Sequence, residues 1–331
     1  MSLRPRIYVT DFLTDELAVE KDILGDLAEV IALGAEREEQ LEGRVEDATC
    51  LMVYHFLSVG ATTLARLRQC KLIVRCGVGV DNVDCSAARK LGIPVSNVPD
   101  YGTEEVADTT IGMLLTLTRG THLLNSRLRA GRGEWTYTQA VPVFRLRGRT
   151  LGIVGLGRIG TATALRAKAL GMQIIFYDPY VADGWDRVHG IDRTESLPAL
   201  LVRSQVLSLH CPATAETCGL IGAAQIAALP RGSFLINTAR GTILDTRAIV
   251  PAIHSGQLAG AGIDVLPGEP PDADDPLVAA WRNPEDPCHD RVILGPHAAF
   301  YCEEGLKDIR VKAAQACRCA LLSRPLKNVV N

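Results

Sequence analysis

Short apolar runs alternate with longer amphipathic stretches along almost the whole chain. In the first hundred residues, four runs have the length and composition of buried strands, at residues 6–9, 51–54, 72–75 and 94–97. A second series contains six such runs, at residues 151–154, 173–177, 206–209, 233–237, 260–264 and 291–294. Strands that alternate with helices are typical of parallel sheets covered by helices on both faces. The pattern therefore predicts an α/β chain with two doubly wound sheets.

The order of these segments indicates how the domains are connected. A long helix is expected over residues 103–130, ended by Gly131, and a last amphipathic helix over residues 303–323, before Pro325. Residues 267–287 are rich in Pro and Asp and are expected to form a loop with one short helix. Because the second series lies in the middle of the chain, we predict that residues 103–298 form a domain inserted into another, made of residues 1–102 and 299–331.

Composition narrows the class of protein. A length of 331 residues favours two domains, and a net charge of −3 provides no basic field for nucleic acid or anionic lipid. No apolar run is long enough to cross a membrane, and no signal-peptide core follows the N-terminus, so we expect a cytoplasmic protein without membrane or nucleic-acid partners. The ten cysteines are scattered and form no C-x-x-C pair. We interpret them as reduced thiols and predict no metal site.

The strongest local motif consists of Gly155, Gly157 and Gly160. It follows the strand at residues 151–154 and opens a helix at residues 158–170, and Asp178 lies eighteen residues past Gly160. This is the context of a dinucleotide-binding turn, in which the glycines let a pyrophosphate approach the helix N-terminus. A carboxylate at position 178 would accept hydrogen bonds from the adenosine ribose and repel a 2′-phosphate. The motif predicts NAD rather than NADP.

Three further residues follow strands of the same series and could carry hydride chemistry. Arg240 follows the strand at residues 233–237, Glu269 lies in the loop after residue 264, and His297 follows the strand at residues 291–294. A guanidinium suits a substrate carboxylate, and an imidazole suits proton exchange near neutral pH. Ligands of open α/β sheets bind beyond the carboxyl ends of the strands, where all three residues are expected.

The chain resembles the D-isomer-specific 2-hydroxyacid dehydrogenase family along nearly its whole length. The matching stretches are residues 73–84, 104–110, 155–160, 177–180, 237–241, 264–270 and 296–299. Within the family the chain is most similar to the C-terminal-binding proteins. The resemblance implies two Rossmann-like or flavodoxin-like domains, with the NAD-binding domain inserted into the substrate-binding domain. It also implies a cytoplasmic NAD-dependent oxidoreductase that acts on the CH–OH group of 2-hydroxy acids.

The resemblance also assigns roles to individual residues. Arg240 corresponds to the arginine that binds the carboxylate and carbonyl of a 2-keto acid, His297 to the general acid/base, and Glu269 to its carboxylate partner. Asp264 corresponds to a residue near the nicotinamide carboxamide. The other cofactor contacts that it implies are Gly155, Gly157, Arg158, Ile159, Gly160, Asp178, Thr109, Cys211 and Thr238. The implied substrate contacts are Arg75, the backbone amides of Val78 and Gly79, and Phe300.

Two departures from related patterns bear on specificity. The C-terminal-binding proteins usually carry tryptophan three residues after the catalytic histidine, where this chain has Phe300, so an indole N–H donor is lost. Formate dehydrogenases of the superfamily place glutamine where this chain has Glu269, which argues against formate. Phosphoglycerate, glyoxylate, phosphonopyruvate and branched or aromatic 2-keto acids all remain open as substrates. An NAD-sensing corepressor like the C-terminal-binding proteins is the alternative function.

The segment after the long helix suggests an assembly. Residues 133–147 hold Trp135, Tyr137, Val141, Val143 and Phe144, with no sheet for them to join. In the family this region, here about residues 103–148, crosses to a second subunit. We therefore expect a homodimer that buries these side chains.

Overall fold

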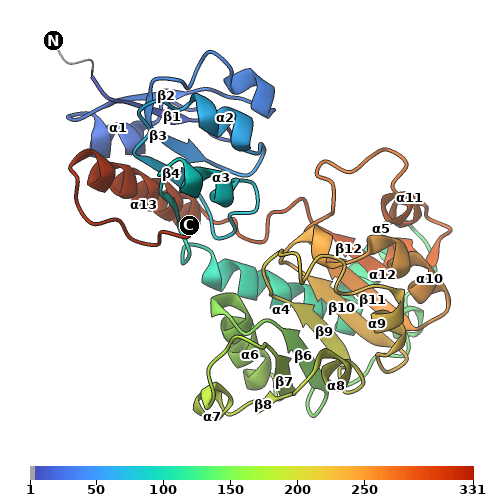
Figure 1. Cartoon of the computed structure of the whole chain (residues 1–331). Coiled ribbons are helices and arrows are strands. Elements are labelled where there is room, and N and C mark those ends of the chain that lie inside the picture. The colour runs from blue at the N-terminus through green and yellow to red at the C-terminus, as the bar shows by residue number, and fades with distance from the viewer. Residues whose placement is uncertain (1–3) are drawn as a thin grey trace. The chain divides into compact units, whose positions relative to one another are not determined.

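The computed structural model describes residues 4–331 and divides into two compact units (Figure 1). Unit 1 comprises Met1–Gly102 and Cys302–Asn331, and unit 2 is the intervening Thr103–Tyr301. The chain passes from unit 1 to unit 2 between Gly102 and Thr103. The return crossing falls between Tyr301 and Cys302, three residues later than the predicted boundary at 298 and 299. Unit 2 is thus inserted into unit 1 along the sequence.

Unit 1 is built on a parallel five-stranded sheet in the order β2-β1-β3-β4-β5. Its strands are β1 (Arg6–Val9), β2 (Glu29–Ala32), β3 (Ala48–Val53), β4 (Leu72–Arg75) and β5 (Val95–Asn97). Its α-helices are α1 (Ala18–Leu24), α2 (Ala61–Arg66), α3 (Cys85–Lys90) and α13 (Glu303–Leu321). The sequence analysis missed β2, an edge strand of four residues that begins with exposed Glu29 and has only one fully buried position. This order is that of flavodoxin-like doubly wound sheets.

Alternation along β3 separates two cores in unit 1. Cys50 and Met52 pack with residues of α1 and α13 on one face, and Leu51 and Val53 pack with residues of α2 and α3 on the other. All four side chains are fully buried. A strand buried on both faces is mostly apolar, which is why residues 51–54 are recognisable in the sequence, although the strand begins three residues earlier, at Ala48.

Unit 2 contains a parallel seven-stranded sheet in the order β12-β11-β10-β9-β6-β7-β8. Its strands are β6 (Thr150–Val154), β7 (Gln173–Tyr177), β8 (Asp192–Arg193), β9 (Val206–Leu209), β10 (Ser233–Asn237), β11 (Leu258–Ile263) and β12 (Val292–Leu294). Residues of α4 (Thr103–Arg119) and α6 (Arg158–Ala169) cover one face. Residues of α8 (Leu197–Leu201), α9 (Ala223–Ala227) and α10 (Ile249–His254) cover the other. The two-residue edge strand β8 was not predicted, because it is too short to leave a pattern.

The single helix expected over residues 103–130 is wrong. The structure has two helices, α4 and α5 (Thr121–Arg129), separated by Gly120 in a left-handed conformation with φ 62°. Glycine adopts this conformation at little cost, and it ends the first helix. None of the residues of α5 is buried.

Unit 2 has three further short α-helices. One is α7 (Trp185–His189), which leads into β8. The second is α11 (Pro276–Arg282), within the Pro- and Asp-rich loop as predicted, and the third is α12 (Pro287–Arg291), which leads directly into β12. Among residues 4–331, no helix combines the length and apolarity needed to cross a membrane.

Candidate active site

The register of the sheet in unit 2 places the ends of six strands in one row. Backbone pairing connects, one strand to the next, Tyr177, Val154, Leu209, Asn237, Ile263 and Leu294. Four candidate residues follow this row immediately: Asp178, Gly155, Thr238 and Asp264. Three others come two or three residues past a strand end: Cys211, Arg240 and His297. Because parallel strands share one carboxyl edge, segments far apart in the sequence meet there. This row is the candidate active site.

The glycine turn is crowded on one side and open on the other. Gly155 has φ 90°, and a Cβ atom there would lie 2.6 Å from the backbone nitrogen of Cys211. A Cβ on Gly160 would lie 2.2 Å from the carbonyl oxygen of Gly155, whereas one on Gly157 would meet nothing within 4 Å. Side chains are therefore excluded at the first and third glycines by packing. The open second position lets a ligand approach the backbone at the start of α6, as a pyrophosphate requires.

Asp178 is fixed to this turn by two backbone hydrogen bonds. Its Oδ2 accepts from the N–H of Leu156 at 2.8 Å, and its Oδ1 accepts from the N–H of Tyr180 at 2.9 Å. The carboxylate that follows β7 is thus hydrogen-bonded to the glycine turn that follows β6. Together they carry the features that an adenosine ribose and a pyrophosphate need, so the residues present fit a dinucleotide.

His297 and Glu269 form a pair in the structure, as the sequence analysis expects. The Nδ1 atom of His297 lies 2.7 Å from Oε2 of Glu269, and Oε1 of Glu269 accepts a hydrogen bond from the N–H of Leu266 at 2.8 Å. The backbone of His297 is left-handed, with φ 57°, an uncommon conformation for a side chain of this size. A carboxylate on Nδ1 leaves Nε2 as the nitrogen that can exchange a proton with a ligand.

Asp264 holds the loop that carries His297. Its two carboxylate oxygens accept the backbone N–H groups of Ala298 and Ala299 at 3.1 and 2.8 Å, and its carbonyl accepts that of His297 at 2.7 Å. Burial raises the pKa of the Asp264 carboxyl. A Cβ on Gly295 would lie 2.1 Å from Oδ1 of Asp264, so only glycine fits there. The geometry assigns Asp264 a positioning contact that the resemblance does not include.

Arg240 lies on a loop fixed by Asn237. The side-chain amide of Asn237 donates to the carbonyl of Arg240 at 3.0 Å and accepts from the N–H of Ala239 at 3.0 Å. A Cβ on Gly241 would lie 2.0 Å from the carbonyl carbon of Leu266, which shows that the Arg240 loop and the loop toward Glu269 touch backbone to backbone. Asn237, Gly241 and Gly295 were not predicted as site residues. Their roles depend on packing between loops that are distant in the sequence. The only sequence signal for these roles is that the three residues lie close to Arg240 or His297 in the chain.

The other expected cofactor contacts are near the same edge. The hydroxyl of Thr109 on α4 donates to the carbonyl of Ala299 at 3.3 Å, while Thr238 shares a buried 2.9 Å hydrogen bond with Thr110. Cys211 packs against the turn at Gly155, and burial raises the pKa of its thiol to about 11. These are neutral, small side chains around the turn. Their contact with NAD stays a prediction, as does that of Arg158 and Ile159.

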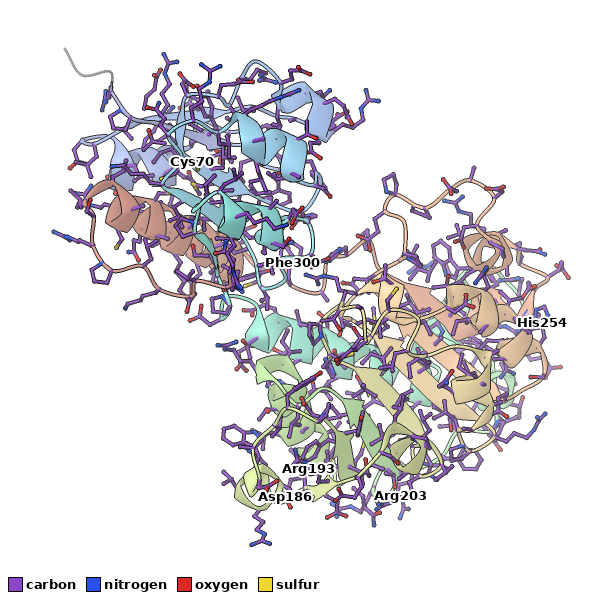
Figure 2. The ribbon with its side chains drawn as sticks, viewed as in Figure 1. Cys70, Asp186, Arg193, Arg203, His254 and Phe300 are labelled. Atoms are coloured by element: carbon purple, nitrogen blue, oxygen red, sulfur yellow. The ribbon has the colours of Figure 1, made fainter. Side chains whose placement is uncertain are left out.

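Phe300 lies beside the histidine. The centroids of the Phe300 and His297 rings are 6.3 Å apart, and the ring planes meet at 82° in an edge-on arrangement. Phe300, labelled in Figure 2, is the second-last residue of unit 2. An aromatic wall on this side of His297 is thus present without an indole N–H.

The substrate-binding residues expected in unit 1 lie at and after the end of β4. Arg75, at the end of β4, is buried; its Nη1 donates to the carbonyl of Cys76 at 3.2 Å and its Nε to Oδ1 of Asn82 at 3.3 Å. A Cβ on Gly77 would lie 1.6 Å from that Nη1, so glycine makes room for the guanidinium. Asn97 holds the adjoining loop through the carbonyl of Val78 at 2.6 Å. Substrate binding by Arg75 and the amides of Val78 and Gly79 stays a prediction.

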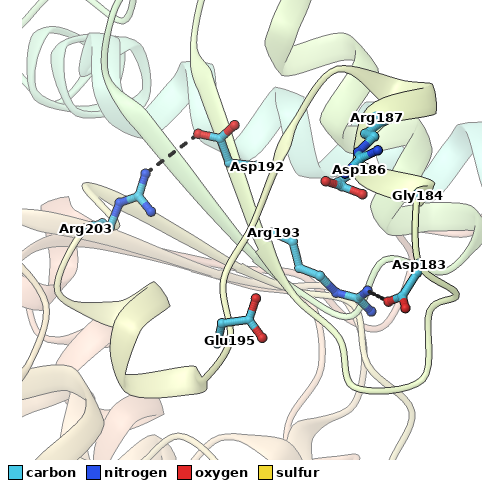
Figure 3. A pocket seen from close by; sticks show the side chains of 8 residues that line it. All are labelled: Asp183, Gly184, Asp186, Arg187, Asp192, Arg193, Glu195 and Arg203. Atoms are coloured by element: carbon cyan, nitrogen blue, oxygen red, sulfur yellow. Dashed lines mark hydrogen bonds and ion pairs between the residues drawn. The ribbon is translucent and has the colours of Figure 1, made fainter.

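A charged hollow of about 560 Å³ lies at the β8 edge of unit 2 (Figure 3). Its walls carry arginines paired with acids: Arg193 with Asp183 at 3.1 Å and Arg203 with Asp192 at 3.8 Å. Arg193 also donates to the carbonyl of Asp178 at 3.0 Å. Arg193 thus ties the hollow to the segment after Asp178, and none of the residues of the glycine turn lines the hollow.

Comparison with known families identifies the chain. The model for the NAD binding domain of D-isomer specific 2-hydroxyacid dehydrogenases matches residues 111–299, which is most of unit 2. The chain therefore belongs to the D-isomer specific 2-hydroxyacid dehydrogenase family, and unit 2 is its NAD-binding domain.

Individual relatives extend the match to both units. The chain is 36% identical to D-3-phosphoglycerate dehydrogenase of Methanocaldococcus jannaschii and 33% identical to C-terminal-binding protein 1 of Caenorhabditis elegans, in each case over 98% of its length. It spans only 59% and 44% of those two relatives. A D-lactate dehydrogenase of Aquifex aeolicus, solved with NAD and lactic acid, is 28% identical with a TM-score of 0.85, covering 96% of each chain.

Proposed function

We propose that the protein is an NAD-dependent D-2-hydroxyacid dehydrogenase that reduces a 2-keto acid or oxidises the corresponding D-2-hydroxy acid. The observation that carries the proposal is the His297–Glu269 pair, at 2.7 Å, on the same sheet edge as the glycine turn. A dinucleotide turn alone serves many functions. A proton donor fixed by a carboxylate on the same sheet edge as that turn is what carbonyl reduction requires.

Each residue has one task in this proposal. The turn from Gly155 to Gly160 and the carboxylate of Asp178 hold the cofactor, which supplies the hydride when bound. Arg240 binds the carboxylate of the substrate and polarises its carbonyl. His297 donates a proton from Nε2 to the carbonyl oxygen during reduction and accepts it back during oxidation. Glu269 holds the imidazole through Nδ1 and stabilises its protonated form.

A panel of 2-keto acids tests this function. The purified protein is mixed with NADH and, one at a time, phosphonooxypyruvate, glyoxylate, pyruvate, phosphonopyruvate and branched or aromatic 2-keto acids, and the loss of NADH absorbance is recorded. We expect turnover with at least one acid. Turnover should fall when Arg240 is replaced by Gln, which keeps polarity but removes the charge. No oxidation with any acid, by protein that binds NADH, would contradict the proposal.

Cofactor preference is a second part of the proposal. The carboxylate of Asp178, held by Leu156 and Tyr180, would repel a 2′-phosphate, so NADH is expected to be used in preference to NADPH. Replacing Asp178 by Ser should bring the ratio of kcat/KM with NADH to kcat/KM with NADPH closer to one. Equal kcat/KM for both cofactors in the unmodified protein would contradict this part.

We also propose that two copies of the chain associate through α5 and the arm, residues 133–147. The side chains of Trp135, Tyr137, Val141 and Phe144 are mostly exposed, at 87%, 77%, 54% and 54%. Four large apolar side chains in ten residues form an unusual surface for a monomer. A second copy is the occupant that we favour, because a symmetric dimer would cover both arms with one self-complementary interface.

Light scattering at micromolar concentration tests the dimer. The unmodified chain should have twice the mass of a monomer, and the double variant Trp135→Ala, Phe144→Ala should shift to the monomer. The matched control is Trp185→Ala, Val188→Ala, which removes exposed apolar side chains of α7 outside the arm. A monomer mass for the unmodified chain would refute the dimer.

Binding of a peptide motif is the alternative function. The similarity to C-terminal-binding protein 1 over nearly the whole chain favours it. A peptide-recruitment assay with and without NADH distinguishes the two: capture of a motif peptide by protein that reduces no 2-keto acid would favour this alternative.

A further inference from the structure

Three potential metal ligands meet where α10 ends and α12 begins. His254 is the last residue of α10, Asp286 is the N-cap of α12, and Cys288 lies within its first turn. The Nε2 atom of His254 is 2.9 and 3.0 Å from the two carboxylate oxygens of Asp286. One ligand atom of each residue, including the Cys288 sulfur, lies within 4.8 Å of the others. The three ligand atoms are therefore close enough for one ion to contact all of them.

Their arrangement follows from local structure. Asp286 accepts the N–H of Cys288 at 2.8 Å, and this cap holds the carboxylate beside the thiol. Cys288 is fully buried in the core of unit 2, whereas the side chain of His254 is 45% exposed. The sequence shows no ligand pair here, because thirty-two residues separate His254 from Asp286. Only the packing of α10 against α12 brings the nitrogen, oxygen and sulfur atoms together.

The set of ligand atoms indicates the class of ion. Calcium and magnesium select oxygen ligands, whereas zinc and related cations accept thiolate, imidazole and carboxylate in tetrahedral sites. An ion pair between His254 and Asp286 would account for those two residues alone. It would not account for a third ligand type, the thiol, within reach of both.

We propose that His254, Asp286 and Cys288 bind a zinc-like divalent cation, with a fourth, solvent-facing position taken by water. Burial and the neighbouring Asp286 raise the pKa of the Cys288 thiol to about 12, so this sulfur is protonated without the metal. When the sulfur–metal bond forms, the thiol proton passes to solvent. The proposal does not depend on the dehydrogenase activity.

The position of the site suggests what a bound ion would do. His254 ends a helix four residues before β11 begins, so the site lies toward the amino edge of the sheet, opposite the row that holds the glycine turn. Figure 2 shows His254 at the outer edge of unit 2. From α12, Asp290 binds Arg127 of α5 at 2.7 Å, and its carbonyl lies 2.9 Å from Nε2 of His122. A metal would thus link α10 to α12, which in turn holds α5.

Cobalt substitution tests the site on the full chain. Protein treated with a chelator and then titrated with Co²⁺ alone should develop tetrahedral d–d bands and a sulfur-to-cobalt charge-transfer band, and Zn²⁺ should abolish both. His254→Ala removes a partly exposed side chain, so the fold should tolerate it, and it should weaken Co²⁺ binding by at least about tenfold. Cys288→Ser should remove the charge-transfer band. Cys218→Ser, which removes an exposed thiol elsewhere in unit 2, is the matched control. It should change neither the affinity for Co²⁺ nor the charge-transfer band.

A thermal measurement provides the second readout. Zn²⁺ should raise the Tm of the unmodified protein and of Cys218→Ser but not that of His254→Ala, while NADH affinity stays the same in all three. Octahedral cobalt bands without charge transfer would overturn the proposal. The same holds for charge-transfer bands that persist unchanged in both His254→Ala and Cys288→Ser, because the ion would then be bound at other thiols.

Discussion

The two units share a doubly wound architecture but differ at the point where the strand order reverses. In unit 1 this point lies between β1 and β3, and in unit 2 it lies between β6 and β9. Ligands of such sheets bind at this point. In unit 1, Asp11 follows β1 and its carboxylate accepts the N–H groups of Tyr54 and Phe56, at 2.9 and 2.8 Å. In unit 2, Gly155 follows β6 and offers no side chain at all.

The two units differ in which group accepts hydrogen bonds from the backbone N–H groups at the switch point, the place where the strand order reverses. In unit 1 the acceptor is the buried carboxylate of Asp11, and the hydroxyl of Thr10 donates a third hydrogen bond to this carboxylate. In unit 2 the glycines leave the start of α6 accessible to an anion, and Asp178 is held to one side for a ribose. The same fold therefore has a buried carboxylate at one switch point and an open glycine turn at the other.

The largest expected effect concerns the chemistry on the open edge of unit 2. His297→Ala removes the proton donor and should lower kcat by about 10²- to 10⁴-fold with little change in NADH affinity. Steady-state kinetics and NADH fluorescence titration measure the two quantities. His289→Ala removes an imidazole of α12 that bonds the carbonyl of Trp281, and is the control. If both variants lost kcat equally, the effect of His297→Ala would be structural.

The next effect concerns the open switch point itself. Gly155→Ala should weaken NADH binding at least about a hundredfold, or about 2.8 kcal/mol, because the new methyl group would displace the backbone at Cys211. Gly184→Ala is the matched control: its φ of 86° imposes similar strain, but a Cβ there meets nothing within 4 Å. Equal loss of NADH affinity in both variants would show that backbone strain, not the open turn, determines binding.

A smaller effect is expected at the switch point of unit 1. Asp11→Asn loses one of the two acceptor oxygens and should lower the free energy of unfolding by about 2 kcal/mol, without changing NADH affinity. Asp84→Asn is the control, since this N-cap accepts one N–H, from Ala87, and asparagine caps equally well. Urea unfolding followed by circular dichroism measures the difference. An unchanged free energy of unfolding in Asp11→Asn would show that the hydrogen bonds of the Asp11 carboxylate do not stabilise the switch point of unit 1.

The smallest effect is a pH dependence next to the glycine turn. Burial lowers the pKa of His210 to about 4, and its Nε2 lies 2.9 Å from the Ser208 hydroxyl. Because the unfolded chain binds a proton at this residue more readily, its contribution to stability is complete above about pH 6.5 and is lost as the pH falls toward 4. His210→Gln should flatten this loss, by about 1 kcal/mol between pH 7 and pH 5.5. Parallel stability curves for the two proteins would contradict the prediction.

The sequence predicts the parts of this molecule that depend on strand pattern and local motifs. Strands buried on both faces, such as β3 and β10, were found because each contains a run of consecutive apolar residues. Gly155 and Asp178 were found because their spacing is local. The edge strands β2 and β8 and the break at Gly120 leave weaker patterns and were missed. Positions whose role depends on contact between distant loops, such as Gly241 against Leu266, or His254 against Asp286, require the fold itself.

Isotope transfer tests the central claim most directly. The protein is incubated with a reactive 2-keto acid and NADH that carries deuterium at the nicotinamide C4 position, and the product is analysed by chiral chromatography and mass spectrometry. The account predicts deuterium at C2 of the D-2-hydroxy acid, in an amount equal to the NADH consumed, and almost none with His297→Ala in the same time. Product without deuterium at C2 when either C4 position is labelled, or product of L configuration, would contradict it.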